Sequence, residues 1–126
     1  MNRGHRIFTA AVFAGTVAWA CGGLLASAHA APVMVIATLT AAPGKEAALK
    51  DILLPLAEST RHEAGCLGYT VLQNNAKPAQ YFTYEQWASQ AAIDAHLKGP
   101  GLAAAMPKFQ SVLGEAPTLT SLTPIP

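Results

Sequence analysis

Segment 33–40 constrains this chain most, because it is a β-branched run with apolar side chains on both faces of the expected strand. One face carries Val33, Val35, Ala37 and Leu39, and the other carries Met34 and Ile36. The aromatic run 80–87 repeats the pattern, with Tyr81 and Trp87 opposite Phe82 and Tyr84. An open sheet with two apolar faces is stable in water only if both are covered. We expect helices on one face and a second copy of the chain on the other.

The first helix is predicted over Lys45–Glu63, after a turn at Pro43-Gly44. Its apolar residues recur at three- and four-residue steps, as one stripe of a helix does. Pro55 removes one backbone donor and predicts a kink or a broken second half. Gly65 is expected to cap the helix.

A β-hairpin follows, with strands over 66–73 and 80–87 joined by a loop over 74–78. Asn74 and Asn75 suit this loop because Asn tolerates left-handed backbone, and Pro78 ends the pairing. The hairpin places two strands next to each other in the sheet.

Ser89 is expected to cap a second helix, and the sequence Gly99-Pro100-Gly101 ends it. A further helical piece places Leu102, Met106, Phe109 and Leu113 on one face, and 118–125 alternates as a final strand. The order β-α-β-β-α-β predicts an α+β fold, a ferredoxin-like split β-α-β sheet with the helices on one face.

Composition and charge narrow the function. The chain is 52% hydrophobic and only 12% charged, which excludes a disordered chain. Two of its eight basic residues, Arg3 and Arg6, lie in the leader, so six remain against seven acidic residues. No basic stripe is left for phosphates, and nucleic-acid binding is not expected.

Residues 1–30 resemble a signal peptide, with a basic start, an apolar stretch over 7–26 and a small-residue cleavage site at Ala28-His29-Ala30. Residues 31–126 then form a single domain that is periplasmic or secreted and has no membrane segment after cleavage. The alternative is an uncleaved anchor, since 20 apolar residues barely span a bilayer. Lipid attachment at Cys21 is disfavoured by the preceding Trp19.

Cleavage removes Cys21 and leaves Cys66 as the only cysteine, so no disulfide forms within one mature chain. Cys66 is expected to be a buried small residue entering a strand rather than a reactive thiol.

The strongest chemical constellation is the aromatic strand 80–87 followed by the helix that carries His96. His96 lies on or beside the apolar stripe of that helix, where a neutral imidazole can act as a base near neutral pH. The alternative is structural: aromatics fill cores, and a histidine at a helix border is often only hydrogen-bonded. His62, at the end of the first helix, is expected on the surface.

At these residues the chain resembles the antibiotic biosynthesis monooxygenase family. The motif Tyr84-Glu85-x-Trp87 with His96 behind it carries the resemblance, as does Arg61-x-Glu63-x-Gly65-Cys66-Leu67-x-Tyr69 upstream. The resemblance covers about residues 33–123. It implies a dimeric α+β barrel, in agreement with the homodimer expected from the two apolar sheet faces.

The resemblance also implies a function, a cofactor-independent monooxygenase that oxidises a quinol or another phenolic aromatic with O2. His96 is the implied catalytic base or hydrogen-bond donor. The implied substrate-binding residues are Trp87, Tyr84, Phe82 and Met106. Since successive strand residues face opposite ways, Tyr84 and Trp87 need not line one cavity. The family recurrence of Glu85 is interpreted as structural, with pairing to a cation on a helix or loop.

Three alternatives remain. One is a non-catalytic barrel that binds a small aromatic or lipophilic ligand. Another is a haem-degrading monooxygenase, which is disfavoured because the first strand lacks the asparagine of those enzymes. An anthrone-oxidising activity is weakened because Thr83 stands where polyketide-type members have an asparagine. No cofactor and no metal is expected, since no His or Cys cluster has zinc spacing and no glycine-rich phosphate loop is present.

Overall fold

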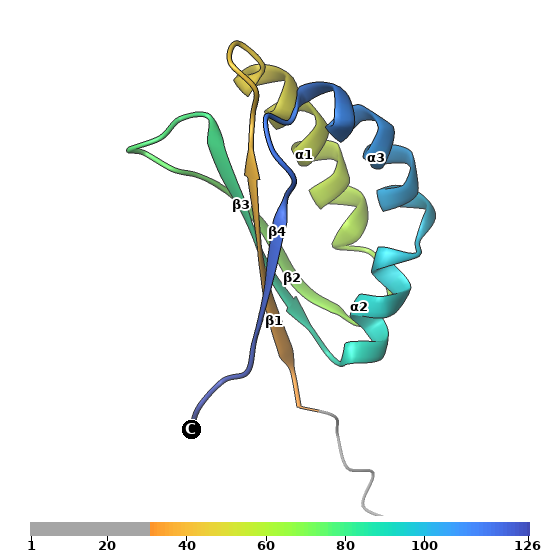
Figure 1. Cartoon of the computed structure of the whole chain (residues 1–126). Coiled ribbons are helices and arrows are strands. Elements are labelled where there is room, and N and C mark those ends of the chain that lie inside the picture. The colour runs from red at the N-terminus through yellow and green to blue at the C-terminus, as the bar shows by residue number, and fades with distance from the viewer. Residues whose placement is uncertain (1–30) are drawn as a thin grey trace, which may run out of the picture.

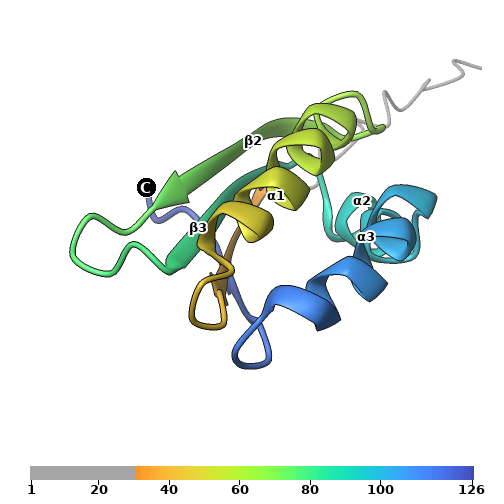
Figure 2. The ribbon, with the colours of Figure 1, turned by 90° about the horizontal axis from the view of Figure 1, so that it is seen from above.

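The computed structural model describes residues 31–126. It holds seven elements, in the order β1 (Val33–Thr40), α1 (Glu46–Thr60), β2 (Cys66–Gln73), β3 (Gln80–Trp87), α2 (Gln90–Leu97), α3 (Pro100–Val112) and β4 (Thr118–Leu122). The four strands form one antiparallel sheet in the order β2-β3-β1-β4. All three helices lie on one face of it (Figures 1 and 2). The predicted ferredoxin-like α+β fold is confirmed.

The helix-facing side of the sheet forms the core. Burial alternates along β3, where Tyr81, Thr83, Glu85 and Trp87 are buried against the helices. Strand β1 buries Val35, Ala37 and Leu39 on the same side of the sheet. Trp87 and Leu49 are fully buried, and a large apolar side chain buried in this way contributes about 1.5–3 kcal/mol.

The opposite face of the sheet carries no helix in the part of the chain that the structure describes (Figure 2). Its half-buried side chains include Met34, Ile36, Phe82 and Tyr84. The hydroxyl of Tyr84 accepts a hydrogen bond from Gln86 Nε2 at 3.0 Å and donates one to Met34 Sδ at 3.4 Å. Both apolar faces expected from the sequence are therefore present, and the covering of the second face by another copy stays a prediction.

Two details of the first helix differ from expectation. Helix α1 is continuous through Pro55, so the predicted break is absent. The helix ends at Thr60 with Arg61 as its C-cap, so Gly65, four residues after that cap, does not cap it. Gly65 has a φ of +82°, so its conformational freedom serves the turn into β2 instead.

The hairpin strands have the predicted bounds, but the loop turns for a different reason. No non-glycine residue among the described residues has a positive φ. Instead, Asn74 Oδ1 accepts hydrogen bonds from the backbone nitrogens of Ala76 and Lys77, at 2.9 and 3.3 Å. This is an Asx turn, in which the side chain replaces a backbone acceptor.

The C-terminal helices also refine the prediction. Ser89 caps α2 as expected, its Oγ accepting from the backbone nitrogen of Ala92 at 3.2 Å. Helix α3 is rotated relative to the predicted stripe: Ala105, Phe109 and Val112 are buried, while Met106 is 43% exposed. None of the helices formed by residues 31–126 combines the length and apolar character needed to cross a bilayer. The predicted signal peptide lies outside the described residues.

Candidate functional site

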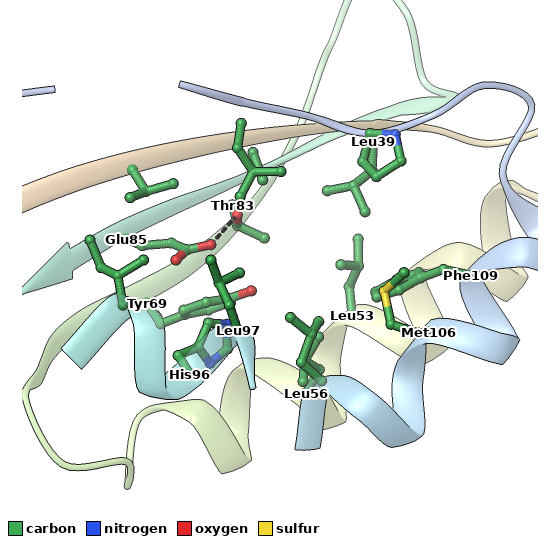
Figure 3. Close-up of a pocket in the computed structure, with 16 residues that line it drawn as sticks. Leu39, Leu53, Leu56, Tyr69, Thr83, Glu85, His96, Leu97, Met106 and Phe109 are labelled. Atoms are coloured by element: carbon green, nitrogen blue, oxygen red, sulfur yellow. Dashed lines mark hydrogen bonds between the residues drawn. The ribbon is translucent and has the colours of Figure 1, made fainter. Parts of the chain in front are cut away.

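A cavity of about 200 Å³ lies between the sheet and the three helices (Figure 3). Its walls are mostly aliphatic and aromatic, with contributions from β1, α1, α2, α3 and β4. Four side chains with polar groups also line it, namely Tyr69, Thr83, Glu85 and His96. An apolar cavity with a few convergent polar groups is the usual form of a small-molecule site.

His96 is buried on α2, with 4% of its surface exposed, and its Nδ1 lies 2.8 Å from Glu63 Oε2. A carboxylate at Nδ1 favours the tautomer with the proton on that nitrogen, which leaves Nε2 as an acceptor. The His96 ring also lies 4.9 Å from the Trp87 ring and 6.1 Å from the Tyr69 ring, between centroids. Three elements therefore fix the orientation of the imidazole.

Glu63, which sequence reasoning did not place in the site, belongs to the turn between α1 and β2. Its side chain is 28% exposed. Together with His96 it lines a second, more open hollow beside Gly101 at the start of α3. The carboxylate thus connects the buried imidazole to solvent. The only sequence signal was the position of Glu63 inside the recognised motif.

The turn that holds Glu63 packs tightly on α2 through Gly65. A Cβ on Gly65 would lie 2.5 Å from the Cβ of Ala92. The carbonyl of Gly65 accepts from the backbone nitrogen of Ala88 at 2.8 Å. This close approach brings Glu63 and His96 together although they are 33 positions apart.

Glu85 is 5% exposed on β3, and both of its carboxylate oxygens accept hydrogen bonds. Thr83 Oγ1 donates to Oε1 at 2.7 Å, and Trp87 Nε1 donates to Oε2 at 2.9 Å. The structure records no salt bridge to Glu85 among residues 31–126. The interpretation that a helix or loop cation pairs with Glu85 was wrong: each of its oxygens accepts from a neutral donor on the same strand instead.

Tyr69 lies opposite Glu85 in the β2–β3 pairing. Burial raises the pKa of its hydroxyl well above the usual value, and the nearby charge of Glu85 adds to the shift. Tyr69 therefore keeps its proton at any physiological pH. Arg61 Nε donates to the Tyr69 carbonyl at 3.0 Å and ties this strand to the end of α1.

The structure brings only some of the predicted site residues together. His96 and Met106 both line the cavity. Trp87 is fully buried behind the cavity wall, in contact with His96 and hydrogen-bonded to Glu85, so its place in the site is that of a support.

Phe82 and Tyr84 do not line this cavity. They alternate with the buried residues of β3 and so point to the sheet face that has no helix. The alternation expected for this strand thus separates them from His96. A role for them in substrate binding stays a prediction that concerns the other face.

Two further sequence expectations concern residues near the site. His62 is on the surface as predicted, with 80% of its side chain exposed. Cys66 begins β2 as predicted but is half-buried rather than buried. Its partial burial raises the pKa of the thiol, which disfavours the nucleophilic thiolate.

The cavity does not fit a haem. The pockets that hold drug-sized ligands are about 300–1,000 Å³, larger than the 200 Å³ available here. Among the described residues, no group of three or more His, Cys, Asp or Glu side chains is arranged to hold a metal ion.

Comparison with known proteins agrees with this architecture. The family model described as antibiotic biosynthesis monooxygenase matches residues 32–108. The crystal structure of PA3566 from Pseudomonas aeruginosa is 30% identical, with a TM-score of 0.73, and the match covers 78% of this chain and 98% of that protein. The structure of Rv0793 from Mycobacterium tuberculosis is 26% identical, with a TM-score of 0.71 and coverage of 76% and 97%.

One curated relative, the protein sll1783 from Synechocystis, is 25% identical over 69 residues. The match covers 55% of this chain and 47% of that protein, so the chain spans about half the length of the curated relative.

Proposed function

Since the chain belongs to the antibiotic biosynthesis monooxygenase family, we propose that it oxidises a quinol or another phenolic aromatic with O2, without a metal or flavin. Family membership supports the reaction class, and the site supports the choice of base. One observation carries the proposal: an imidazole that a carboxylate orients at 2.8 Å lines an apolar cavity.

In the proposed reaction, His96 Nε2 takes the proton of a substrate hydroxyl. The resulting aromatic anion is electron-rich and supplies the electrons that reduce O2. For a simple quinol the balance is quinol plus O2 giving hydroxyquinone plus water, so the ring supplies all four electrons. The apolar walls exclude water from the anion, and a positioned base typically contributes 10²–10⁴-fold to the rate.

Two neighbours of His96 assist it. Glu63 stabilises the imidazolium that forms and, being partly exposed, provides a path by which the proton reaches solvent. Tyr69 keeps its proton because burial raises its pKa, so its ring beside the imidazole adds no negative charge next to the substrate anion.

The test is oxygen consumption by the mature protein, residues 31–126, with a panel of hydroquinones and polycyclic phenols. We expect uptake above the autoxidation blank and a fall of at least about 100-fold in His96→Ala, because the base is lost. His62→Ala is the matched control, since that histidine is exposed, and we expect no change. Trp87→Phe, which removes one donor to Glu85, is expected to weaken uptake less.

Unchanged uptake in His96→Ala would contradict the assignment of the base. No uptake with any substrate would favour the alternative, a non-catalytic domain that binds a small aromatic or lipophilic ligand. The predominantly apolar walls of the cavity favour this second candidate. Tight ligand binding without oxygen consumption would identify it.

We also propose that the protein works as an exported homodimer. The sheet face without helices is the surface on which a second copy packs. The leader is removed after Ala30, so mass spectrometry of the purified protein should find Ala31 as the first residue.

A further inference from the structure

We propose that Glu85 binds a second hydroxyl group of the substrate, so that the cavity selects a compact dihydroxy aromatic over an aromatic with one hydroxyl. The inference rests on the proposed function in taking the same cavity as the substrate site. It concerns binding and not turnover, so the two can fail separately.

The Glu85 carboxylate occupies an unusual position. It lies in the wall of an apolar cavity with 5% of its surface exposed. Its two oxygens accept from Thr83 Oγ1 and Trp87 Nε1, so neither of these contacts uses a proton of the carboxyl group. A buried carboxylate is costly unless it is fully hydrogen-bonded.

The hydrogen-bonding capacity of the Glu85 carboxylate is not filled. An ionised carboxylate offers about four acceptor positions. Thr83 and Trp87 take two of them, and the hydroxyl of Tyr69, which faces Glu85 across the strand pair, takes at most one more. At least one acceptor position is left for a donor, and the cavity beside Glu85 is where a ligand hydroxyl can supply it (Figure 3).

Glu85 and His96 both line the cavity. Glu85 is on the sheet and His96 on helix α2, so they belong to different walls of the same cavity (Figure 3). Trp87 contacts both, through its Nε1 to Glu85 and its ring to His96. A ligand in the cavity thus meets two separate acceptors, His96 for one hydroxyl and Glu85 for another.

The volume of the cavity limits the size of the ligand. A cavity of about 200 Å³ is slightly larger than the cavity of about 150 Å³ that holds benzene in an engineered protein. One substituted ring fits this volume. The chemical class indicated is therefore a dihydroxybenzene.

The test compares two matched ligand pairs, hydroquinone with 4-methoxyphenol and catechol with 2-methoxyphenol, by calorimetric titration of the mature protein under argon. Within a pair, methylation removes one donor and leaves the ring and the other hydroxyl. A hydrogen bond to a charged group contributes about 1.5–3 kcal/mol, so at least one dihydroxy compound should bind about 10- to 100-fold more tightly than its ether.

Glu85→Gln should reduce that preference to about twofold or less. The glutamine amide can donate a hydrogen bond to the methoxy oxygen, so the ether also finds a partner in this variant. Asp94→Asn, which removes an exposed carboxylate from α2, should leave it unchanged. If Glu85→Gln does not fold, Glu85→Asp provides the same comparison, since the shorter side chain withdraws the carboxylate from the cavity.

A preference that is equal in the wild type and in the folded Glu85 variant would overturn the inference, as would the absence of any preference in both pairs. Oxygen uptake by a protein without the preference would leave the proposed function standing and refute the role of Glu85. The preference without uptake would support the role of Glu85 and refute the oxygenase.

Discussion

His96 acquires its chemical character from neighbours that are distant in sequence. Glu63 lies 33 positions earlier and Tyr69 belongs to strand β2, yet both lie against the imidazole. The carboxylate fixes the tautomer, and the aromatic rings of Tyr69 and Trp87 restrict the ring orientation. At the scale of the residue, the candidate site is therefore a supported histidine rather than an isolated one.

The role of Glu63 can be separated from a purely structural one. Glu63→Ala should lower kcat about 10- to 100-fold with a smaller change in KM, because a charge-assisted hydrogen bond of about 1.5–3 kcal/mol no longer orients His96. Glu63→Gln should recover much of kcat, since its amide oxygen still accepts from Nδ1. Steady-state oxygen uptake measures both. A glutamine variant as weak as the alanine variant would contradict orientation by Glu63.

The buried hydroxyl of Tyr69 makes stability depend on alkaline pH. The unfolded chain releases this proton near pH 10, whereas the native state retains it because burial raises the pKa. The unfolded state therefore binds fewer protons above pH 10, and the free energy of unfolding falls by up to about 1.4 kcal/mol per pH unit. Urea unfolding from pH 8 to 11.5 should show this fall reduced in Tyr69→Phe, and parallel curves for the two proteins would contradict it.

The element that organises the site is the turn between α1 and β2. It places Glu63 beside α2, it carries the left-handed Gly65, and its first residue, Arg61, hydrogen-bonds to the carbonyl of Tyr69. The motif from Arg61 to Tyr69 thus corresponds to one structural unit, which packs helix α1, strand β2 and helix α2 against one another.

Gly65→Ala tests this unit, and Gly44→Ala is its matched control. Both glycines have a positive φ, +82° and +77°, but a Cβ on Gly44 has open space while one on Gly65 meets Ala92 at 2.5 Å. We expect Gly44→Ala to cost about 1–2 kcal/mol of unfolding free energy, and Gly65→Ala to cost clearly more and to lower activity as well. Equal losses in denaturant unfolding would contradict the packing argument.

At the scale of the whole molecule, the sheet has one covered and one uncovered face (Figure 2). Leu72 pairs with Phe82 and Leu122 pairs with Met34 on the uncovered face, and their exposed fractions are 48% and 40%. An apolar sheet face of this kind favours association.

Ile36→Glu should therefore produce a monomer, because it places a charge at the centre of the proposed interface. Leu54→Glu is the matched control: it changes an exposed leucine on helix α1 in the same way and should leave the dimer intact. Sedimentation or light scattering gives the mass of each variant. A wild-type protein that is monomeric at high concentration would refute the homodimer.

The sequence by itself determined the elements, because local patterns specify them. Alternation with period two defined β3 to the residue, the Ser89 side chain capped α2 as expected, and Gly99 to Gly101 separated α2 from α3. The order of these elements leaves few antiparallel arrangements, and the ferredoxin-like one follows. The motif around Trp87 and His96 likewise identified the family without coordinates.

Only the tertiary structure decided which residues share the cavity. The period-two pattern separates Phe82 and Tyr84 from Trp87, but only the packing of the helices shows that the cavity lies on the Trp87 side of the sheet. The partners of His96 and Glu85 depended on how the turn at Gly65 packs against α2 and how β2 registers with β3. Such contacts join residues far apart in the chain, and no local pattern encodes them, because they arise only when the helices pack on the sheet.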